Sequence, residues 1–139
     1  MSDLLLVDTS AWHRSGHDAV ADAWAEHLGA DELLVCPQVR LEILYSARSA
    51  ADYEAIASEL DALRQIATGD AAFERALDVQ RRLAHLGGLH HRSAKIADLV
   101  IAASAELAGA IVWHYDEDFD RIAAITGQQC TWIAPRGSL

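Results

Sequence analysis

Four short apolar runs alternate with longer stretches of helical spacing, and no other feature of the sequence restricts the fold as strongly. The runs lie at residues 4–7, 32–36, 111–115 and 130–134. Strands that are apolar on both faces are typical of parallel sheets with helices on both sides. The alternation therefore predicts an α/β fold, a three-layer α/β/α sandwich around a central, mostly parallel sheet.

Apolar residues at intervals of three and four predict the helices between these strands. Pro37 suits the first turn of a helix, Ser93 can cap another, and Gly29 and Gly109 can each end one. Two of the expected helices follow each other closely, at 52–63 and 70–86, and could form a hairpin. The full set covers residues 18–28, 37–47, 52–63, 70–86, 94–107 and 119–126.

The chain length suits one domain with a single core, so we expect residues 1–139 to form one domain. No apolar run approaches the roughly 20 residues of a membrane helix. The start Met1-Ser2-Asp3 lacks the basic segment of a signal peptide, so we expect a soluble, cytoplasmic protein without membrane contact. The net charge of −10 argues against non-specific coating of nucleic acid. It does not exclude a nuclease, because a bound metal supplies local positive charge.

Acids directly follow two of the expected strands. Asp8 comes after the first strand, in VDTSAW, and Asp116 comes after the strand at 111–115. In open α/β sheets, ligands bind beyond the carboxyl ends of the strands, where the strand order reverses. If these two strands are neighbours, both carboxylates meet in one crevice. The alternative is that Asp8 only caps the next turn.

Two further acids lie on helices that border these strand ends. Asp98 lies in IADLVIAASAEL, an apolar helix in which an ionised carboxylate needs a partner. That partner is either Lys95, three residues earlier, or a functional site. Glu42, in VRLEILY, shares a helical stripe with Val39 and Ile43. It either projects inward along the rim of the core or is an ordinary surface glutamate.

Carboxylates that converge in one crevice repel one another unless a cation compensates them. Carboxylate and water oxygens favour hard divalent cations, so we expect Mg²⁺, with Mn²⁺ as a substitute. Histidines give no comparable ligand set, because His90 and His91 are adjacent and His114 lies within a strand. The sequence contains no P-loop, dinucleotide-binding, zinc-protease or serine-hydrolase motif.

Four segments, VDTSAW (7–12), RLEILYSA (40–47), KIADLVIAASAE (95–106) and HYDEDFDRIA (114–123), span almost the whole chain. Together and in this order they resemble the PIN-domain family, and more closely the VapC toxins of bacterial VapBC toxin–antitoxin modules. Each segment is a weak signal alone, and the combination is fairly specific. The resemblance implies a PIN-like sandwich and a metal-dependent endoribonuclease toxin. Such a toxin cleaves RNA by metal-activated water and so inhibits translation and growth.

The resemblance places the family's four catalytic acids at Asp8, Glu42, Asp98 and Asp116. Of these, Asp8, Asp98 and Asp116 are expected to bind the metal. One carboxylate, Asp98 or Glu42, could orient or deprotonate the attacking water.

Residues next to the first and last of these acids have supporting or competing roles. The hydroxyls of Thr9 and Ser10 are expected to support Asp8. Asp118 competes with Asp116 for the fourth acidic position, and either could be the ligand. Asp120 fits a favourable charge at a helix start and is expected to be structural.

The resemblance also implies partners: a cognate VapB antitoxin, a toxin homodimer within a heterotetramer or larger assembly, and an RNA substrate, either tRNA or rRNA. The basic stretch from Arg81 to Lys95 either contacts RNA phosphates or is an ordinary solvated face. A phosphatase of the haloacid dehalogenase type is disfavoured, because it needs an aspartate where this chain has Ser10. The remaining alternative is a catalytically inactive PIN-like protein-interaction module.

Overall fold

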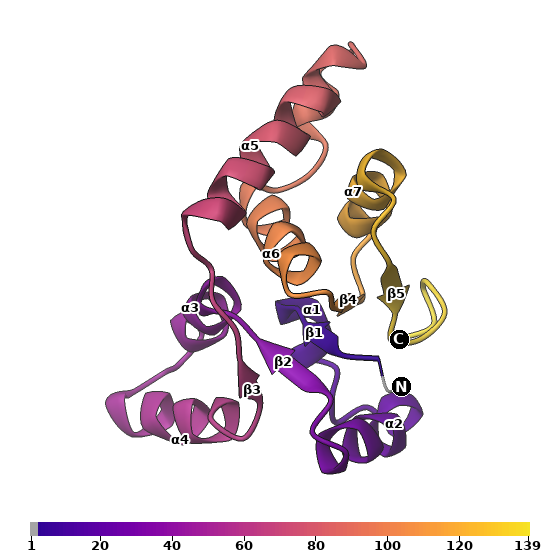
Figure 1. Cartoon of the computed structure of the whole chain (residues 1–139). Helices are drawn as coiled ribbons and strands as arrows, with labels where there is room; N and C mark the ends of the chain where they lie inside the picture. The colour runs from indigo at the N-terminus through magenta and orange to yellow at the C-terminus, as the bar shows by residue number, and fades with distance from the viewer. Residues whose placement is uncertain (1–2) are drawn as a thin grey trace.

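The apolar runs form the centre of a parallel sheet in the computed structural model, which describes residues 3–139 (Figure 1). Its order is β3-β2-β1-β4-β5, and every neighbouring pair is parallel. The predicted α/β architecture is confirmed, and the sheet is parallel throughout rather than mostly parallel. The strands are β1 (Leu5–Val7), β2 (Leu33–Val35), β3 (Arg64–Gln65), β4 (Ile111–His114) and β5 (Cys130–Trp132).

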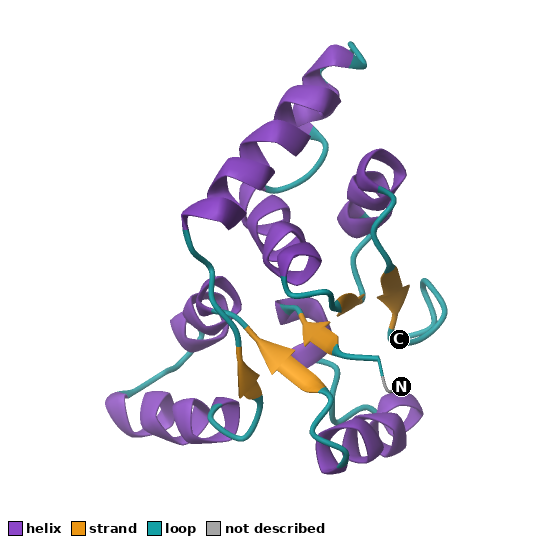
Figure 2. Cartoon of the chain, viewed as in Figure 1, coloured by secondary structure: helices purple, strands orange, loops and turns teal. Residues whose placement is uncertain are grey.

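Helices fill the connections between the strands (Figure 2). Pro37 begins a helix as predicted, and Gly127, with φ of 72°, ends one in the left-handed conformation that glycine adopts easily. The helices are α1 (Thr9–Trp12), α2 (Asp18–Gly29), α3 (Pro37–Tyr45), α4 (Ala50–Leu60), α5 (Asp70–His85), the short 3₁₀ helix η1 (His90–Arg92), α6 (Ile96–Leu107) and α7 (Asp118–Thr126).

The strand order changes direction beside β1. The chain runs from β1 through β2 to β3 on one side, then returns to place β4 and β5 on the other side. Leu5 pairs with Ile111 and Val7 with Trp113, so β1 and β4 are direct neighbours. Their carboxyl ends therefore form the switch point at which α/β sheets bind ligands.

Helices cover both faces of the sheet. In Figure 1, α2 and α4 lie on one side of the strands, and α6 and α7 lie on the other. Helix α5 packs against α6, and α3 contacts both α1 and α6. These contacts bring the start of α6 close to the carboxyl ends of β1 and β4.

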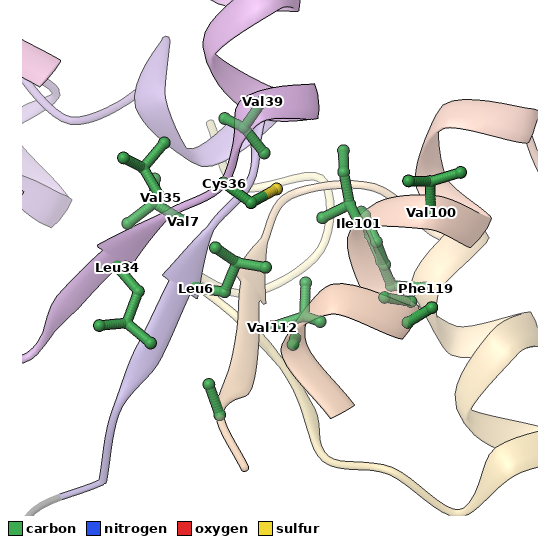
Figure 3. Close-up of a cluster of buried hydrophobic side chains, with 14 of the residues drawn as sticks. Leu6, Val7, Leu34, Val35, Cys36, Val39, Val100, Ile101, Val112 and Phe119 are labelled. Atoms are coloured by element: carbon green, nitrogen blue, oxygen red, sulfur yellow. The ribbon is translucent and has the colours of Figure 1, made fainter. Parts of the chain in front are cut away.

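The central strands are apolar on both faces because both faces are buried in the hydrophobic core (Figure 3). Leu6, Leu34 and Val35 are at most 1% exposed, as are Ile101 from α6 and Phe119 from α7. Full burial of such a side chain contributes about 1.5–3 kcal/mol, so a polar residue at these strand positions is strongly disfavoured. Among residues 3–139, no helix combines the length and apolar character needed to cross a membrane.

Two local predictions are wrong. The expected helical hairpin does not form, because β3 lies between α4 and α5 and its neighbour Ile66 donates its backbone N–H to the Val35 carbonyl at 3.0 Å. Ser93 does not cap α6, since its hydroxyl donates to the His90 carbonyl at 2.6 Å. The start of α6 is instead held by Asp118, whose carboxylate accepts the backbone N–H of Lys95 at 3.1 Å.

Candidate metal centre

Asp8 sits at the carboxyl end of β1 and is only 3% exposed. Its carboxylate caps α1 by accepting the N–H of Ala11 at 2.9 Å, and it accepts the Ser10 hydroxyl at 2.8 Å. Burial, opposed by these hydrogen bonds and reinforced by the charge of Asp116, raises the pKa of Asp8 to about 6. Asp8 therefore caps α1, as the alternative interpretation predicts, and its carboxylate is also buried close to other acids.

Asp98 lies in the first turn of α6 and is 5% exposed. Burial is the main cause that raises its pKa to about 8; Lys95 opposes the shift, while Asp118, Asp116 and Asp8 add to it. The positive end of the helix dipole favours an acid at this position, yet it does not offset the burial. Asp98 is therefore a carboxylate that lacks sufficient compensating charge.

Asp116 and Asp118 flank the turn between β4 and α7. The N–H of Asp118 donates to Asp116 Oδ1 at 3.0 Å, which folds the two acids toward the same side. One carboxylate oxygen from each of Asp98, Asp116 and Asp118 lies within 4.8 Å of the other two. The acidic stretch after β4 thus meets the start of α6, as the placement of the acids in the sequence predicts.

Both oxygens of Asp116 and both oxygens of Asp118 accept hydrogen bonds, but Asp118 also pairs with a second cation. Its Oδ1 accepts Arg121 at 2.8 Å, and its Oδ2 accepts both the backbone and the ammonium of Lys95, at 3.1 and 3.0 Å. Burial opposes the shift, but the hydrogen bonds with Lys95 and Asp98 and the charge of Lys95 hold the pKa of Asp118 below its usual value. Asp118 is a partner in a hydrogen-bond network as well as a member of the acidic group.

Lys95 contacts more acids than its spacing from Asp98 in the sequence predicts. Its ammonium lies 3.4 Å from Asp98, as the spacing suggests, but also 2.7 Å from Asp116 and 3.0 Å from Asp118. Partial burial lowers its pKa, and the hydrogen bonds to Asp116 and Asp118 outweigh this and raise the pKa above the usual value. The predicted pairing of Lys95 with Asp98 is present, but the lysine contacts the whole group of three acids, and a functional role for Asp98 stays a prediction.

Glu42 approaches from α3 and stands outside the group of three. Its Oε2 atom is buried and has no hydrogen-bond partner among the described residues, and the same holds for the hydroxyl of Thr9. Burial is the main cause that raises the pKa of Glu42, and the nearby polar side chain of Thr9, the charge of Lys95 and the side chain of Gln38 oppose the shift. A buried carboxylate oxygen without a partner is costly unless a cation or water satisfies it.

Ser10 links the carboxyl ends of β1 and β4 through hydrogen bonds. Its hydroxyl bonds Asp8 and accepts the N–H of Tyr115 at 2.8 Å, across the gap between β1 and β4. The predicted support of Asp8 thus comes from Ser10, whereas the Thr9 hydroxyl makes no hydrogen bond within the described residues. His114 is fully buried; its Nδ1 accepts the N–H of Asp116 at 3.1 Å, and it does not belong to the acidic group.

The residues present fit a hard divalent cation. The group of three offers carboxylate oxygens from the start of α6, the turn after β4 and the start of α7, which is the donor set that Mg²⁺ and Mn²⁺ prefer, and Asp8 at the end of β1 lies outside this group. The pKa values of Asp8 and Asp98 are raised, and the Oε2 atom of Glu42 has no hydrogen-bond partner. A bound cation would stabilise the ionised form of these carboxylates. No sulfur or imidazole ligand belongs to this group in the part of the chain that the structure describes.

Comparison with known proteins assigns the chain to a family. A PIN domain profile matches residues 5–125, and the chain belongs to the PIN-domain family. Within that family its relatives are VapC proteins. The chain is 63% identical to Ribonuclease VapC18 of Mycobacterium tuberculosis over 133 residues, which cover 96% of this chain and 97% of the relative. It is 41% identical to Ribonuclease VapC51 of the same organism, over 96% of each chain.

Solved structures agree on the fold. The DNA-bound VapBC of Salmonella typhimurium matches with a TM-score of 0.77 at 16% identity, covering 96% of this chain and 100% of that chain. VapBC-5 of Mycobacterium tuberculosis matches with a TM-score of 0.63 at 22% identity, covering 94% of this chain and 98% of that chain. At such identities the match establishes the sandwich architecture, which is the predicted one.

Proposed function

We propose that this chain is a metal-dependent endoribonuclease and the toxin of a type II toxin–antitoxin module, acting in the cytoplasm as one PIN domain. The observation that carries the proposal is the convergence of buried, undercompensated carboxylates at the switch point of the sheet. The chain's 63% identity to a protein named as a ribonuclease, over nearly its whole length, supports the reaction class.

We assign metal binding to Asp8, Asp98 and Asp116, with Mg²⁺ as the ion and Mn²⁺ as a substitute. When bound, such an ion lowers the pKa of a coordinated water and neutralises charge on the phosphate. Asp118 is the weaker candidate ligand, because its carboxylate pairs with two cations, Lys95 and Arg121, whereas that of Asp116 pairs with Lys95.

Glu42 is the best placed residue to orient the attacking water or to accept its proton. Its buried Oε2 is unpartnered, and its raised pKa lies closer to the range useful for a general base than that of an exposed glutamate. Asp98 remains the alternative for this role. The expected products are a 5′-phosphate and a 3′-hydroxyl, as the family resemblance implies.

RNA binding is assigned to the basic stretch that leads into α6. Arg81, Arg82, His85 and Arg92 are exposed there, although Arg82 also pairs with Asp78 at 3.2 Å. A phosphate contact by Arg92 predicts that Arg92→Ala reduces the slope of log affinity against log salt by about one. An unchanged slope would assign Arg92 to an ordinary solvated surface.

We propose an antitoxin of the VapB type as the protein partner and a homodimer as the state of the toxin. The matched solved structures include VapBC complexes, two of them with DNA. On this chain, α3 presents Leu41 at 67% and Tyr45 at 92% exposure, on the same helix as Glu42. Apolar surface beside negative charge suits a partner segment that combines apolar and basic side chains.

The test is cleavage of total RNA by the purified chain. We expect cleavage with about 5 to 10 mM Mg²⁺ or Mn²⁺, enough to saturate a site of few carboxylates, and none with EDTA. Asp8→Asn should reduce the rate roughly 100-fold or more. Asp22→Asn, which removes an exposed acid from α2, is the matched control and should cleave normally.

Two outcomes would contradict the proposal. Cleavage that survives EDTA, or that is equal in Asp8→Asn and the native chain, would remove the metal site from the reaction. No cleavage of any RNA, with antitoxin binding intact, would favour the catalytically inactive interaction module. Sequencing of 5′-monophosphate ends after induced expression would identify whether tRNA, rRNA or another RNA is cut.

A further inference from the structure

The sequence contains a single lysine, and the fold places it on the acidic centre. All other permanently charged basic side chains are arginines, and among residues 3–139 Lys95 is the one cation that reaches all three of Asp98, Asp116 and Asp118. A compact ammonium resembles a small cation more closely than the planar guanidinium of arginine does. Arg121, by contrast, binds Asp118 on the side shared with Glu117.

The lysine ammonium lies among the oxygens that a metal would need. It is 2.7 Å from Asp116 Oδ2 and 3.4 Å from Asp98 Oδ2, the acids assigned above as ligands. Two cations cannot share those oxygens at such distances without strong repulsion. Lysine contact and metal ligation through these oxygens of Asp98 and Asp116 therefore compete.

The lysine can leave without unfolding the site. Its side chain is 64% exposed, whereas the acids beneath it are largely buried. Its backbone is fixed at the start of α6 by the hydrogen bond from its N–H to Asp118. Rotation of the four-carbon stem alone would carry the ammonium into solvent, with α6 and the carboxylates left in place.

We propose that Lys95 is an internal counter-cation that competes with the divalent metal for Asp98 and Asp116, and that metal binding displaces its ammonium. The inference rests on the proposed metal site and adds a residue that sets its affinity. Lys95 neutralises the acidic group when the metal is not bound and so preserves its geometry. The same contact weakens metal binding, because the metal must break the lysine's ion pairs before it can bind.

The first test compares Mn²⁺ affinity, by calorimetry or electron paramagnetic resonance, in the native chain, Lys95→Gln and Arg48→Gln. Arg48→Gln is the matched control, since it removes one positive charge from a residue between α3 and α4. We expect Lys95→Gln to lower the dissociation constant about 5- to 30-fold, the range of a coupling between interacting groups. The control should stay within about twofold of the native value.

The second test observes Lys95 directly. Reductive methylation with ¹³C-formaldehyde labels only this lysine and the amino terminus, because the chain has no other lysine. We expect the dimethyl-lysine carbon signal to shift on Mg²⁺ addition, with the same midpoint as binding measured by calorimetry. Thermal melts give a further readout: Lys95→Gln should melt lower than the native chain without metal and gain more from Mn²⁺.

The outcomes separate this proposal from the proposed function. A native chain that binds Mn²⁺, with Lys95→Gln binding equally or more weakly, would overturn the counter-cation role and leave the metal site standing. A lysine signal that ignores Mg²⁺ while calorimetry detects binding would do the same. A native chain that binds no Mn²⁺ at millimolar concentration would refute the metal site itself, and the counter-cation role with it.

Discussion

Asp98→Asn is expected to raise stability and abolish function, and the structure sets the size of both effects. The native pKa of Asp98 is raised from 3.8 to about 8, so folding without metal favours its protonated form. A group with a raised pKa contributes most below its unfolded pKa and loses that contribution as the pH rises through its folded pKa. The destabilisation by Asp98 should therefore grow between about pH 4 and pH 8.

The raised pKa sets an upper limit on the gain from asparagine. At about 1.4 kcal/mol per pKa unit, the rise of the Asp98 pKa corresponds to roughly 5 kcal/mol at about pH 8. Reorientation of the exposed Lys95 and of nearby acids absorbs part of this energy, so we expect a gain of about 1–3 kcal/mol. For a chain of this size, that gain corresponds to an increase of about 3–10 °C in Tm.

The assay is a set of thermal melts in EDTA at pH 5 and pH 8, with and without added Mg²⁺. Asp98→Asn should melt above the native chain at pH 8 and near it at pH 5. Mg²⁺ at 100 times its dissociation constant should stabilise the native chain by about 2.7 kcal/mol and so raise its Tm. The same addition should leave Asp98→Asn unchanged, because a ligand charge is gone.

Asp22→Asn serves as the control, because Asp22 is exposed on α2. It should show neither the pH-dependent gain nor the loss of the Mg²⁺ response. An Asp98→Asn variant that melts below the native chain at pH 8, or equally above it at both pH values, would refute the argument. A preserved Mg²⁺ response in Asp98→Asn would show that Asp98 is not a ligand.

Three further predictions concern the remaining acids. Mn²⁺ affinity should rise between about pH 5.5 and pH 8, since Asp8 and Asp98, with pKa values raised to about 6 and 8, must lose protons to bind a cation; calorimetry that finds constant affinity would contradict this. Asp116→Asn should weaken Mn²⁺ binding about 10-fold or more. Asp118→Asn should mainly lower the Tm, because hydrogen bonds to its carboxylate are lost; the reverse result would exchange the roles of the two acids. Glu42→Gln should keep Mn²⁺ affinity within about threefold but slow RNA cleavage, because its unpartnered oxygen lies outside the group of three acids; an equal loss of both would make Glu42 a ligand.

The sequence predicts the approximate position of the site because the acids follow strands whose burial is evident. β1 and β4 are apolar on both faces, so the amino-acid pattern alone places their carboxyl ends, and Asp8 and Asp116 with them. The choice between Asp116 and Asp118 stays a prediction. The structure adds one argument, namely that Asp118 pairs with both Lys95 and Arg121, whereas Asp116 pairs with Lys95.

The features that the sequence does not predict are short or depend on contacts between distant segments. β3 consists of Arg64 and Gln65, two exposed polar residues without a strand pattern. α1 has four residues and is set by the cap from Asp8 rather than by periodicity. The reach of Lys95 to Asp116, 21 positions away, depends on how α6 packs beside the turn before α7, which no local pattern encodes.

Diffraction from crystals grown with Mn²⁺, recorded where manganese scatters anomalously, tests the central claim most directly. We predict an anomalous peak about 2.0–2.3 Å from carboxylate oxygens of Asp8, Asp98 and Asp116, with the Lys95 ammonium moved away from them. A peak elsewhere, or no peak at millimolar Mn²⁺ with Lys95 still on Asp116, would contradict the claim that these acids form the metal centre of a nuclease.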